Sequence, residues 1–249
     1  MKTTAAARQF PCEKCPLQDF SHFQRHEKDE VSFLSSFKMG ELVADTGTTV
    51  LVEGANSAHL FTVLSGWGFR YKTLDDGRRQ ILNYVLPGDL IGLQGSVMKK
   101  MQHSIEALSP MILCMFQRDN LANLFRNFPA LGYDITWLAS REEQMLDEIL
   151  LSVGRRTALE RAAYLFAFIF QRAQSVGMVK SGKLTVPVTQ QHVADTLGLS
   201  IVHTNKTLKK LASRGALRWL DRGCEVLDEQ ILMDISGWQG LPATPRPYI

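Results

Sequence analysis

Hydrophobic and polar residues alternate between about Phe37 and Arg118, with a period of two that turn residues interrupt. Asp76-Gly77 lies between two alternating runs and is a strong hairpin signal, because both central positions of such a turn favour positive φ. Many short strands at this spacing predict a β-barrel or jelly roll. The predicted strands cover residues 49–52, 60–64, 68–72 and 81–85.

The pattern then changes to helical spacing, from Phe128-Pro129 to Val153, and Gly154 ends it. Glu142 interrupts a run that is otherwise long enough for about six turns. A helix of this length between two domains predicts a dimer seam, and the alternative is a helix packed on its own β-domain. The residues predicted to form the seam are Ile135, Leu138, Leu146, Ile149 and Val153.

Residues 188–211 predict two short helices joined by a tight turn. Thr189 suits the N-cap of the first helix, Gly198 the turn, and Ser200 the N-cap of the second. The first helix has an apolar face made of Val193, Ala194 and Leu197. Small and apolar residues therefore fall together at the positions of a helix-turn-helix motif.

The second of these helices has one face for the core and one for a partner. The residues predicted to be buried are Ile201, Thr204 and Leu208. The opposite face carries Val202, His203, Asn205, Lys206 and Lys209. Lys210, Arg214 and Arg218 follow, and no acidic residue comes before Asp221. Such a helix suits a DNA major groove, and the alternative is a helical hairpin inside an enzyme core.

Two further patterns flank this motif. Thr157-Ala-Leu-Glu160 matches a capping box, which opens a helix that runs through Phe170. After the second helix, residues 216–219 and 225–227 flank Asp221-Arg-Gly223 and predict a hairpin. A hairpin in this place is a wing, so the motif is predicted to be a winged helix.

Composition narrows the class of protein. The chain has 249 residues, enough for two domains, and its net charge of +3 is too small for a diffuse polycation. DNA affinity would therefore come from a local patch. The sequence has no apolar run of membrane length and no signal-peptide core, which predicts a cytoplasmic protein with no membrane partner. It contains no nucleophile–base pairing, Walker loop or His-Glu-x-x-His motif, which argues against an enzyme.

A β-roll, a long helix and a C-terminal winged helix, in this order, resemble the Crp/Fnr family of bacterial transcription regulators. The resemblance covers about Cys12 to Leu232 and implies a homodimer on a palindromic operator in double-stranded DNA, with RNA polymerase as a further partner. The motifs that carry it are Gly54, Gly66, Asp76-Gly77, Gly88-Asp-Leu-Ile-Gly92, residues 155–161 and Leu197-Gly-Leu-Ser200.

The predicted fold class is α+β. Its order is an N-terminal β-roll similar to cyclic nucleotide-binding jelly rolls, a long dimerisation helix and a C-terminal winged helix-turn-helix. Composition predicts weak order at both ends, because the first residues are small and polar and the last nine carry three prolines. The predicted domains are a flexible segment 1–20, a sensor 21–127, a helix 128–154, a DNA-binding domain 155–235 and a flexible tail 236–249.

Within the family the β-roll often binds a cyclic nucleotide, and this sequence departs from the pattern of the members that bind cyclic AMP. The Glu that would hold the ribose is Leu93, and the Arg that would pair with the phosphate is His103. A buried phosphate without its guanidinium would be left uncompensated. The resemblance therefore does not extend to cyclic AMP, although another small ligand stays open.

The Fnr branch of the family binds an iron–sulfur cluster through three N-terminal cysteines and one on the β-roll. Cys12, Cys15 and Cys114 match three of these positions, and the fourth falls on Ser21, whose alkoxide is hard to form at neutral pH. Three interpretations stay open. The cysteines hold a labile cluster, or Cys12 and Cys15 form a thiol switch or a metal site with His22, or all are remnants.

The resemblance also assigns residues to DNA. Family members carry Glu and Arg on the recognition helix, and these positions are Val202 and Lys206 here. Val202 can contact a thymine methyl, Lys206 can donate to guanine, and Asn205 suits adenine. The predicted phosphate contacts are Thr189, Gln190, Lys209 and Lys210, and Ser200 and His203 complete the predicted DNA-binding set.

Three functions are weighed. The order of elements predicts a sequence-specific transcription regulator, responsive to redox state or oxygen if the cysteines serve that purpose. The first alternative is a cofactor-independent regulator of the same family. The second is a sensor module that acts through protein contacts and carries a vestigial DNA domain.

Overall fold

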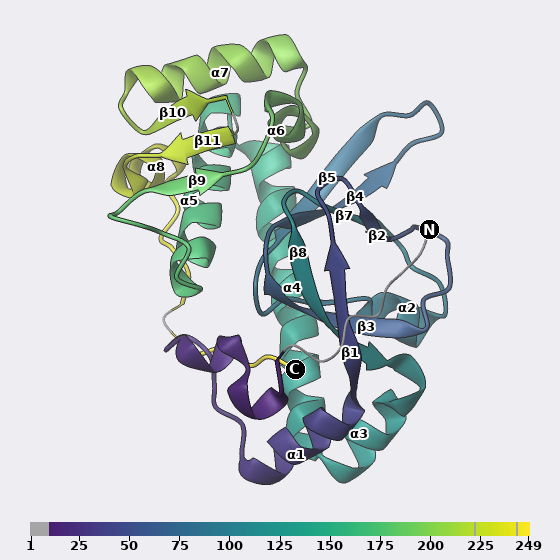
Figure 1. Cartoon of the computed structure of the whole chain (residues 1–249). Coiled ribbons are helices and arrows are strands. Elements are labelled where there is room, and N and C mark those ends of the chain that lie inside the picture. Colours follow the sequence, from purple (N-terminus) through teal and green to yellow (C-terminus); the bar gives the residue numbers. More distant parts are fainter. Residues whose placement is uncertain (1–9, 222, 243) are drawn as a thin grey trace. The chain divides into compact units, whose positions relative to one another are not determined.

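The computed structural model describes residues 10–221, 223–242 and 244–249 (Figure 1). The helices are α1 (Lys28–Phe37), α2 (Leu93–Met98), α3 (Leu121–Asn127), α4 (Pro129–Arg155), α5 (Ala158–Ser175), α6 (Gln190–Leu197), α7 (Ile201–Ser213) and α8 (Glu229–Ser236), and the 3-10 turns are η1 (Cys12–Lys14), η2 (Pro16–Asp19) and η3 (Arg118–Asn120). The strands are β1 (Lys38–Ala44), β2 (Thr49–Leu51), β3 (His59–Ser65), β4 (Gly68–Thr73), β5 (Arg79–Val85), β6 (Leu90–Ile91), β7 (Ser104–Ala107), β8 (Met111–Gln117), β9 (Leu184–Val186), β10 (Leu217–Leu220) and β11 (Gly223–Val226).

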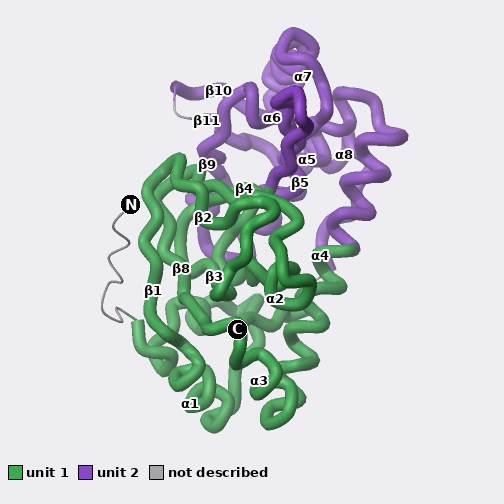
Figure 2. Tube along the Cα trace, turned by 90° about the vertical axis from the view of Figure 1, so that its right-hand side faces the viewer, with its two compact units in different colours: residues 1–70, 85–143, 244–249 green, residues 71–84, 144–243 purple. Residues whose placement is uncertain are grey.

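The chain forms two compact units, coloured separately in Figure 2. Unit 1 takes residues 1–70, 85–143 and 244–249, and unit 2 takes residues 71–84 and 144–243. Most of the β4–β5 hairpin therefore belongs to the unit that contains α5 to α8. The long helix α4 contributes its first half to unit 1 and its second half to unit 2.

Unit 1 contains a sheet of order β1-β8-β3-β6 with antiparallel neighbours. It also contains β2 and β7 of a second sheet, of order β2-β7-β4-β5, in which most of β4 and β5 belongs to unit 2. Alternate residues of these strands face a shared hydrophobic core, as expected when a strand has one buried face. The core comprises Ala44, Leu51, Phe61, Val63, Val85, Ile91, Met101, Ile105, Ala107, Met111 and Leu113. The predicted β-roll is confirmed.

Unit 2 contains the predicted winged helix. A capping box of Thr157 and Glu160 opens α5, and α6 and α7 follow at the predicted places. Strands β10 and β11 form the hairpin of the wing, and β9 completes a sheet of order β10-β11-β9. Among the described residues, no helix is both long enough and apolar enough to pass through a membrane.

Helix α4 begins at Pro129, as predicted, but it continues through Gly154, which was predicted to end it, to Arg155. Its apolar residues are also not all available for a partner. Ile135 and Leu138 are buried within the chain, and Leu146 and Ile149 are half-buried. The apolar residues that stay exposed are Tyr133, Leu150, Leu151 and Val153. One stripe of the helix covers its own chain, and this gives its apolar residues their regular spacing. Ile135 and Leu138 belong to this stripe, so they are not accessible to a second copy, and the dimer seam itself stays a prediction.

Both ends of the chain depart from the predicted flexible segments. Residues 12–14 and 16–19 form η1 and η2, and Leu17 is fully buried, while residues 1–9 lie outside the described part. At the other end Tyr248 and Ile249 are buried. Small residues and prolines prevent a regular ladder, but they do not prevent individual side chains from finding buried partners in the tertiary structure.

Candidate nucleic-acid interface

The two helices of the motif are positioned by caps that the sequence specifies. The hydroxyl of Thr189 accepts a hydrogen bond from the backbone N–H of His192 at 3.1 Å, and this caps α6. Gly198 ends α6 with φ 64°, a left-handed conformation that glycine adopts without strain. The hydroxyl of Ser200 then accepts from the N–H of His203 at 3.3 Å and caps α7. All three local predictions are confirmed.

Helix α7 lies at the outside of its own unit (Figure 1). Its buried stripe consists of Thr204, Thr207, Leu208 and Leu211. Ile201 was predicted to be buried but is 38% exposed. The helical spacing to Thr204 holds, but Ile201 is the first residue of α7, where less of the unit covers the helix. Together with Val202, which is 62% exposed, it places an apolar patch beside the polar face.

Most of the predicted DNA-binding residues lie at the surface. The exposed ones are Thr189, Ser200, Val202, His203, Lys206, Lys209 and Lys210, and the half-buried ones are Gln190 and Asn205. The amide oxygen of Asn205 is buried and has no hydrogen-bond partner among the described residues. Reading adenine needs both the oxygen and the nitrogen of an amide, so Asn205 would have to rotate to make the predicted contact.

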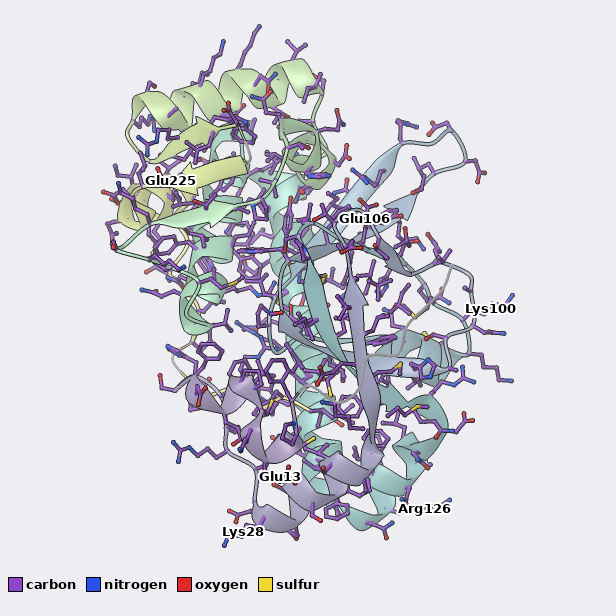
Figure 3. The ribbon with its side chains drawn as sticks, viewed as in Figure 1. Glu13, Lys28, Lys100, Glu106, Arg126 and Glu225 are labelled. Atoms are coloured by element: carbon purple, nitrogen blue, oxygen red, sulfur yellow. The ribbon has the colours of Figure 1, made fainter. Side chains whose placement is uncertain are left out.

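Cationic side chains dominate this surface, although not all of them are available. Lys206, Lys209, Lys210 and Arg214 are exposed on or just after α7. Arg218 on β10 instead forms an ion pair with Glu225 on β11, with 2.5 Å between Nη2 and Oε2 (Figure 3 labels Glu225). Among the residues that the structure describes, which leave out Arg222 of the wing, the patch therefore centres on α7.

The β4–β5 hairpin supports α6, which the sequence pattern did not predict. Tyr84 is buried, and its hydroxyl lies 2.9 Å from the hydroxyl of Thr196. Gln80 donates to the backbone oxygen of Thr196 at 3.0 Å, and Arg79 forms an ion pair with Asp195 at 2.9 Å. These partners lie more than a hundred residues apart in sequence, so no periodic signal could have revealed them.

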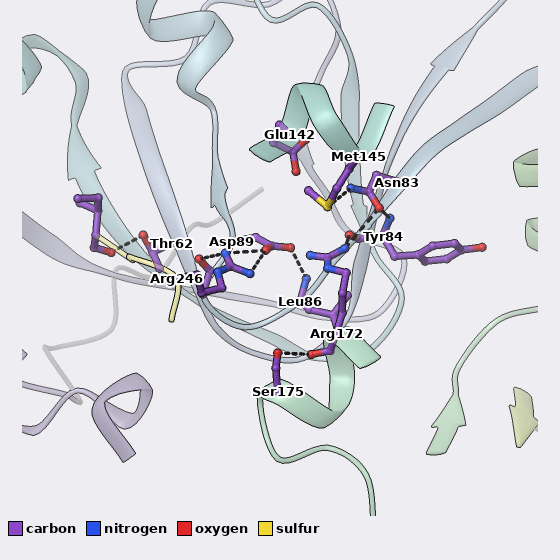
Figure 4. Close-up of polar contacts among 12 residues, drawn as sticks. Thr62, Asn83, Tyr84, Leu86, Asp89, Glu142, Met145, Arg172, Ser175 and Arg246 are labelled. Atoms are coloured by element: carbon purple, nitrogen blue, oxygen red, sulfur yellow. Dashed lines mark hydrogen bonds and ion pairs between the residues drawn. The ribbon is translucent and has the colours of Figure 1, made fainter. Parts of the chain in front are cut away.

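A buried arginine joins the same hairpin to α5. Arg172 is only 5% exposed, and its guanidinium donates to the backbone oxygen of Tyr84 at 2.7 Å and to the amide oxygen of Asn83 at 3.3 Å (Figure 4). Burying a charge is costly unless hydrogen bonds compensate it. The hairpin supplies that compensation, so α5, α6 and β5 form one support beneath α7.

The predicted cysteine site is brought together only in part. Burial raises the pKa of Cys15 to about 11 and of Cys114 to about 12, and the charges of Cys12 and Cys15 contribute to the rise at Cys114. Cys12, Cys15 and Cys114, from η1, its C-cap and β8, therefore share one neighbourhood. Cys224 is buried in the wing, where burial raises its pKa to about 12.

These thiols share their surroundings with an ion pair. Lys38 and Glu41 are buried, with 2.6 Å between Nζ and Oε1, and Lys38 also donates to the backbone oxygen of Phe10. Ser21 and His22, which would complete a ligand set, are both exposed. Within the described residues, no three His, Cys, Asp or Glu side chains converge as a metal site. This chain therefore supplies three of the four thiols of the family pattern, because Ser21 takes the remaining position.

His192 should make stability depend on pH. Its Nδ1 accepts from the N–H of Thr189 at 3.2 Å, and burial, assisted by Arg79, lowers its pKa. Because the folded state disfavours the protonated ring, the unfolded chain binds the proton first as pH falls below about 6.5. We expect the free energy of unfolding to fall between about pH 7 and pH 5, measured by urea denaturation. In His192→Gln the side chain keeps a hydrogen-bond acceptor that does not titrate, so the free energy of unfolding should fall less over this pH range. An equal fall in the variant and the unmodified protein would contradict this role of His192.

Comparison with known proteins gives two domain matches. Residues 41–128 match the cyclic nucleotide-binding domain, and residues 160–235 match the Crp-like helix-turn-helix domain. The first covers the β-roll from β1 to α3, and the second runs from the start of α5 to α8.

Relatives match over most of the chain. The nitrogen fixation regulation protein FixK of Bradyrhizobium diazoefficiens is 32% identical over 74% of this chain and 76% of its own length. The transcriptional activatory protein AadR of Rhodopseudomonas palustris is 30% identical over 68% and 70%, and the transcriptional activator protein FnrL of Cereibacter sphaeroides is 26% identical over 83% of each. The structure of FixK2 from Bradyrhizobium japonicum matches with a TM-score of 0.69 at 23% identity, over 80% of this chain and 98% of that one.

Proposed function

Because this chain belongs to the Crp/Fnr family of transcription regulators, we propose that it binds a palindromic operator as a homodimer, with one α7 in each major groove. Proteins of this family are DNA-binding regulators and not enzymes. The observation that carries the proposal is the exposed, cation-rich face of α7, capped by Ser200 and supported by α6. The second alternative was a sensor module with a vestigial DNA domain. An exposed, cation-rich face on α7 does not support it.

The operator contacts divide into base and phosphate contacts. Val202 and Lys206 are four residues apart on the exposed face, so they lie on one side of the helix and face the same stretch of groove. His203 stands between them. Lys209 and Lys210 follow about one turn later, where the backbone of DNA passes a recognition helix. The operator should therefore offer thymine methyls and a guanine to each half of the dimer.

Two lysines separate base reading from phosphate binding. Lys206→Ala should reduce operator affinity by about 1–3 kcal/mol per half-site, because it removes a donor to a base. Lys209→Ala should weaken binding to operator and random DNA equally and reduce the salt dependence. Fluorescence anisotropy with both DNA fragments, over a range of salt concentrations, measures both effects. Equal losses on both fragments for Lys206→Ala would show that Lys206 contacts phosphate.

The dimer seam is proposed to lie on the second half of α4. Leu150, Leu151 and Val153 are exposed apolar residues at this end, whereas Ile135 and Leu138 already pack inside the chain. Ile149 and Leu146 border the same face and are half-buried. An apolar stripe on a long helix gains from burial against a second copy, as in a coiled coil.

Leu150→Glu should produce monomers, because two facing carboxylates would be buried in an apolar seam. Light scattering should report the monomer mass, and operator binding should be lost. Val97→Glu is the matched control, since it places the same charge at another exposed apolar residue, on α2, and should leave the dimer intact. A Leu150→Glu protein that stays dimeric would place the seam elsewhere.

RNA polymerase is the further partner that we propose, and the cytoplasm is the compartment. Two of the relatives are named as transcriptional activators, a role that requires contact with the transcription machinery. A regulator of this type must reach DNA, which agrees with the predicted cytoplasmic location.

The β-roll is proposed to have a ligand preference other than cyclic AMP. His103, in place of the phosphate-binding guanidinium, is buried, and the hydroxyl of the neighbouring Ser104 accepts from the backbone N–H of Glu53 at 2.9 Å. Leu93 stands in place of the ribose-binding carboxylate. These residues do not offer the paired charges that a cyclic nucleotide phosphate needs.

The cysteines are proposed to act as thiols rather than as cluster ligands. Cys12, Cys15 and Cys114 supply three thiols, and Ser21, whose alkoxide is hard to form at neutral pH, takes the fourth position of the family pattern. Protein purified without oxygen should therefore be colourless and free of iron, as visible absorption and metal analysis would report. Ser21→Cys serves as the comparison, because it restores the fourth position. Iron and sulfide in the unmodified protein would contradict this proposal.

A further inference from the structure

The last described residues of the chain, 244–249, return to unit 1, and we call them the strap. They lie far in sequence from the residues that they contact, and the family's helix-turn-helix domain match ends before them, at residue 235. The strap therefore lies outside both matched domains.

An arginine and its backbone hold the first part of the strap. The guanidinium of Arg246 makes two contacts of 3.1 Å with one carboxylate oxygen of Asp89 and donates to the backbone oxygen of Gly88 at 2.7 Å (Figure 4). Its backbone N–H donates to the oxygen of His22 at 2.8 Å, and the N–H of Gln24 donates to its backbone oxygen at 2.9 Å. The strap thus pairs with the N-terminal segment as a short parallel bridge.

Buried side chains hold the second part. Tyr248 is 3% exposed and packs edge-on against Phe23, with ring centroids 5.4 Å apart, and lies 4.5 Å from the ring of His26. The hydroxyl of Thr62 donates to the backbone oxygen of Ile249 at 2.5 Å. Burial of the Tyr248 ring favours the docked strap, and so does the hydrogen bond that satisfies the backbone oxygen of Ile249.

The docking surface is also the neighbourhood of the cysteines. Cys12 begins η1 and Cys15 lies between η1 and η2, a few residues before Phe23 and His26. Burial raises the pKa of Tyr248, and the charges of Cys15 and Cys12 raise it further. Thr62 on β3 pairs with Cys114 on β8 in the sheet register. Any change that moves the N-terminal segment would therefore remove part of the surface that holds the strap.

The residues just before the strap are fixed to unit 2. Trp238 packs edge-on against the rings of Tyr164 and Phe168 on α5, and the N–H of Leu241 donates to the side chain of Gln171 at 2.6 Å. Four residues separate Leu241 from Arg246. A chain of that length spans at most about 18 Å when fully extended. Docking of the strap therefore leaves only this short length of chain between Leu241 and unit 1.

We propose that the strap is an intramolecular tether, and that its docking on the N-terminal segment alters DNA binding. The inference rests on the DNA-binding function proposed above. A contact that restricts one unit changes the populations of its arrangements, and DNA that prefers one arrangement must in turn change the docking of the strap. The strap is held by one ion pair, one ring and a few backbone hydrogen bonds, which suits reversible release.

The first experiment measures docking and DNA affinity in the same full-length variants. Arg246→Ala and Tyr248→Ala should each accelerate hydrogen exchange at the Gln24 amide, whose acceptor is the backbone of Arg246, by at least about tenfold. Operator affinity should change by at least about fivefold in both variants, in the same direction. Arg126→Ala removes an exposed arginine on α3 (Figure 3) and should change neither quantity.

The second experiment disturbs the docking surface from the side of the N-terminal segment. Cys15→Asp places a charge beside Tyr248 and should undock the strap, giving the same rise in Gln24 exchange and the same change in affinity as Tyr248→Ala. Cys15→Ser should behave as the unmodified protein. In the double variant Cys15→Asp/Tyr248→Ala the effects should not add, because both changes act on one contact.

Two outcomes would overturn the proposal, and a third would overturn the DNA-binding function on which it rests. Faster Gln24 exchange with unchanged operator affinity would make the strap a structural tail. Unchanged Gln24 exchange in Arg246→Ala and Tyr248→Ala would show that the strap does not dock there. If the unmodified protein binds no operator, the DNA-binding proposal fails first, and the unmodified protein alone reveals this.

Discussion

The buried guanidinium of Arg172 is the interaction on which the DNA-facing part of this chain depends. Its charge requires acceptors that water cannot provide in the interior, and the β4–β5 hairpin supplies them through Tyr84 and Asn83. Removing either partner would leave an uncompensated charge or unpaired carbonyls. The hairpin is thereby fixed to α5, and its own residues Arg79 and Gln80 then hold α6.

This arrangement explains why the compact units do not follow the order of the chain. Residues 71–84 leave the β-roll in sequence but belong to the unit of the helix-turn-helix. The strap does the reverse, because it follows α8 in sequence but belongs to the unit of the β-roll. Together with α4, these segments give the chain several covalent connections between the units, so a change in one unit has more than one route to the other.

The N-terminal cysteines are better understood through their neighbours than as ligands. Three thiols are an incomplete set for a four-cysteine cluster, but Cys12 and Cys15 lie in the N-terminal segment, a few residues before the side chains that bind the strap. A negative charge at Cys15 would raise the pKa of Tyr248, whose ring packs against Phe23 in that segment.

Local sequence patterns specify the helices, strands and turns of this chain and their order. Thr189, Gly198 and Ser200 specify caps and a turn within a few residues, and alternation specifies the strands, because caps and amphipathic faces depend on near neighbours. These patterns could not assign the faces of α4, because Ile135 and Leu138 have the same spacing whether they meet their own chain or a partner. Only the tertiary structure decided that Arg172 meets Tyr84 and that Arg246 meets Asp89. Those partners are far apart in the chain, and a buried charge finds its acceptors through packing that no local pattern encodes.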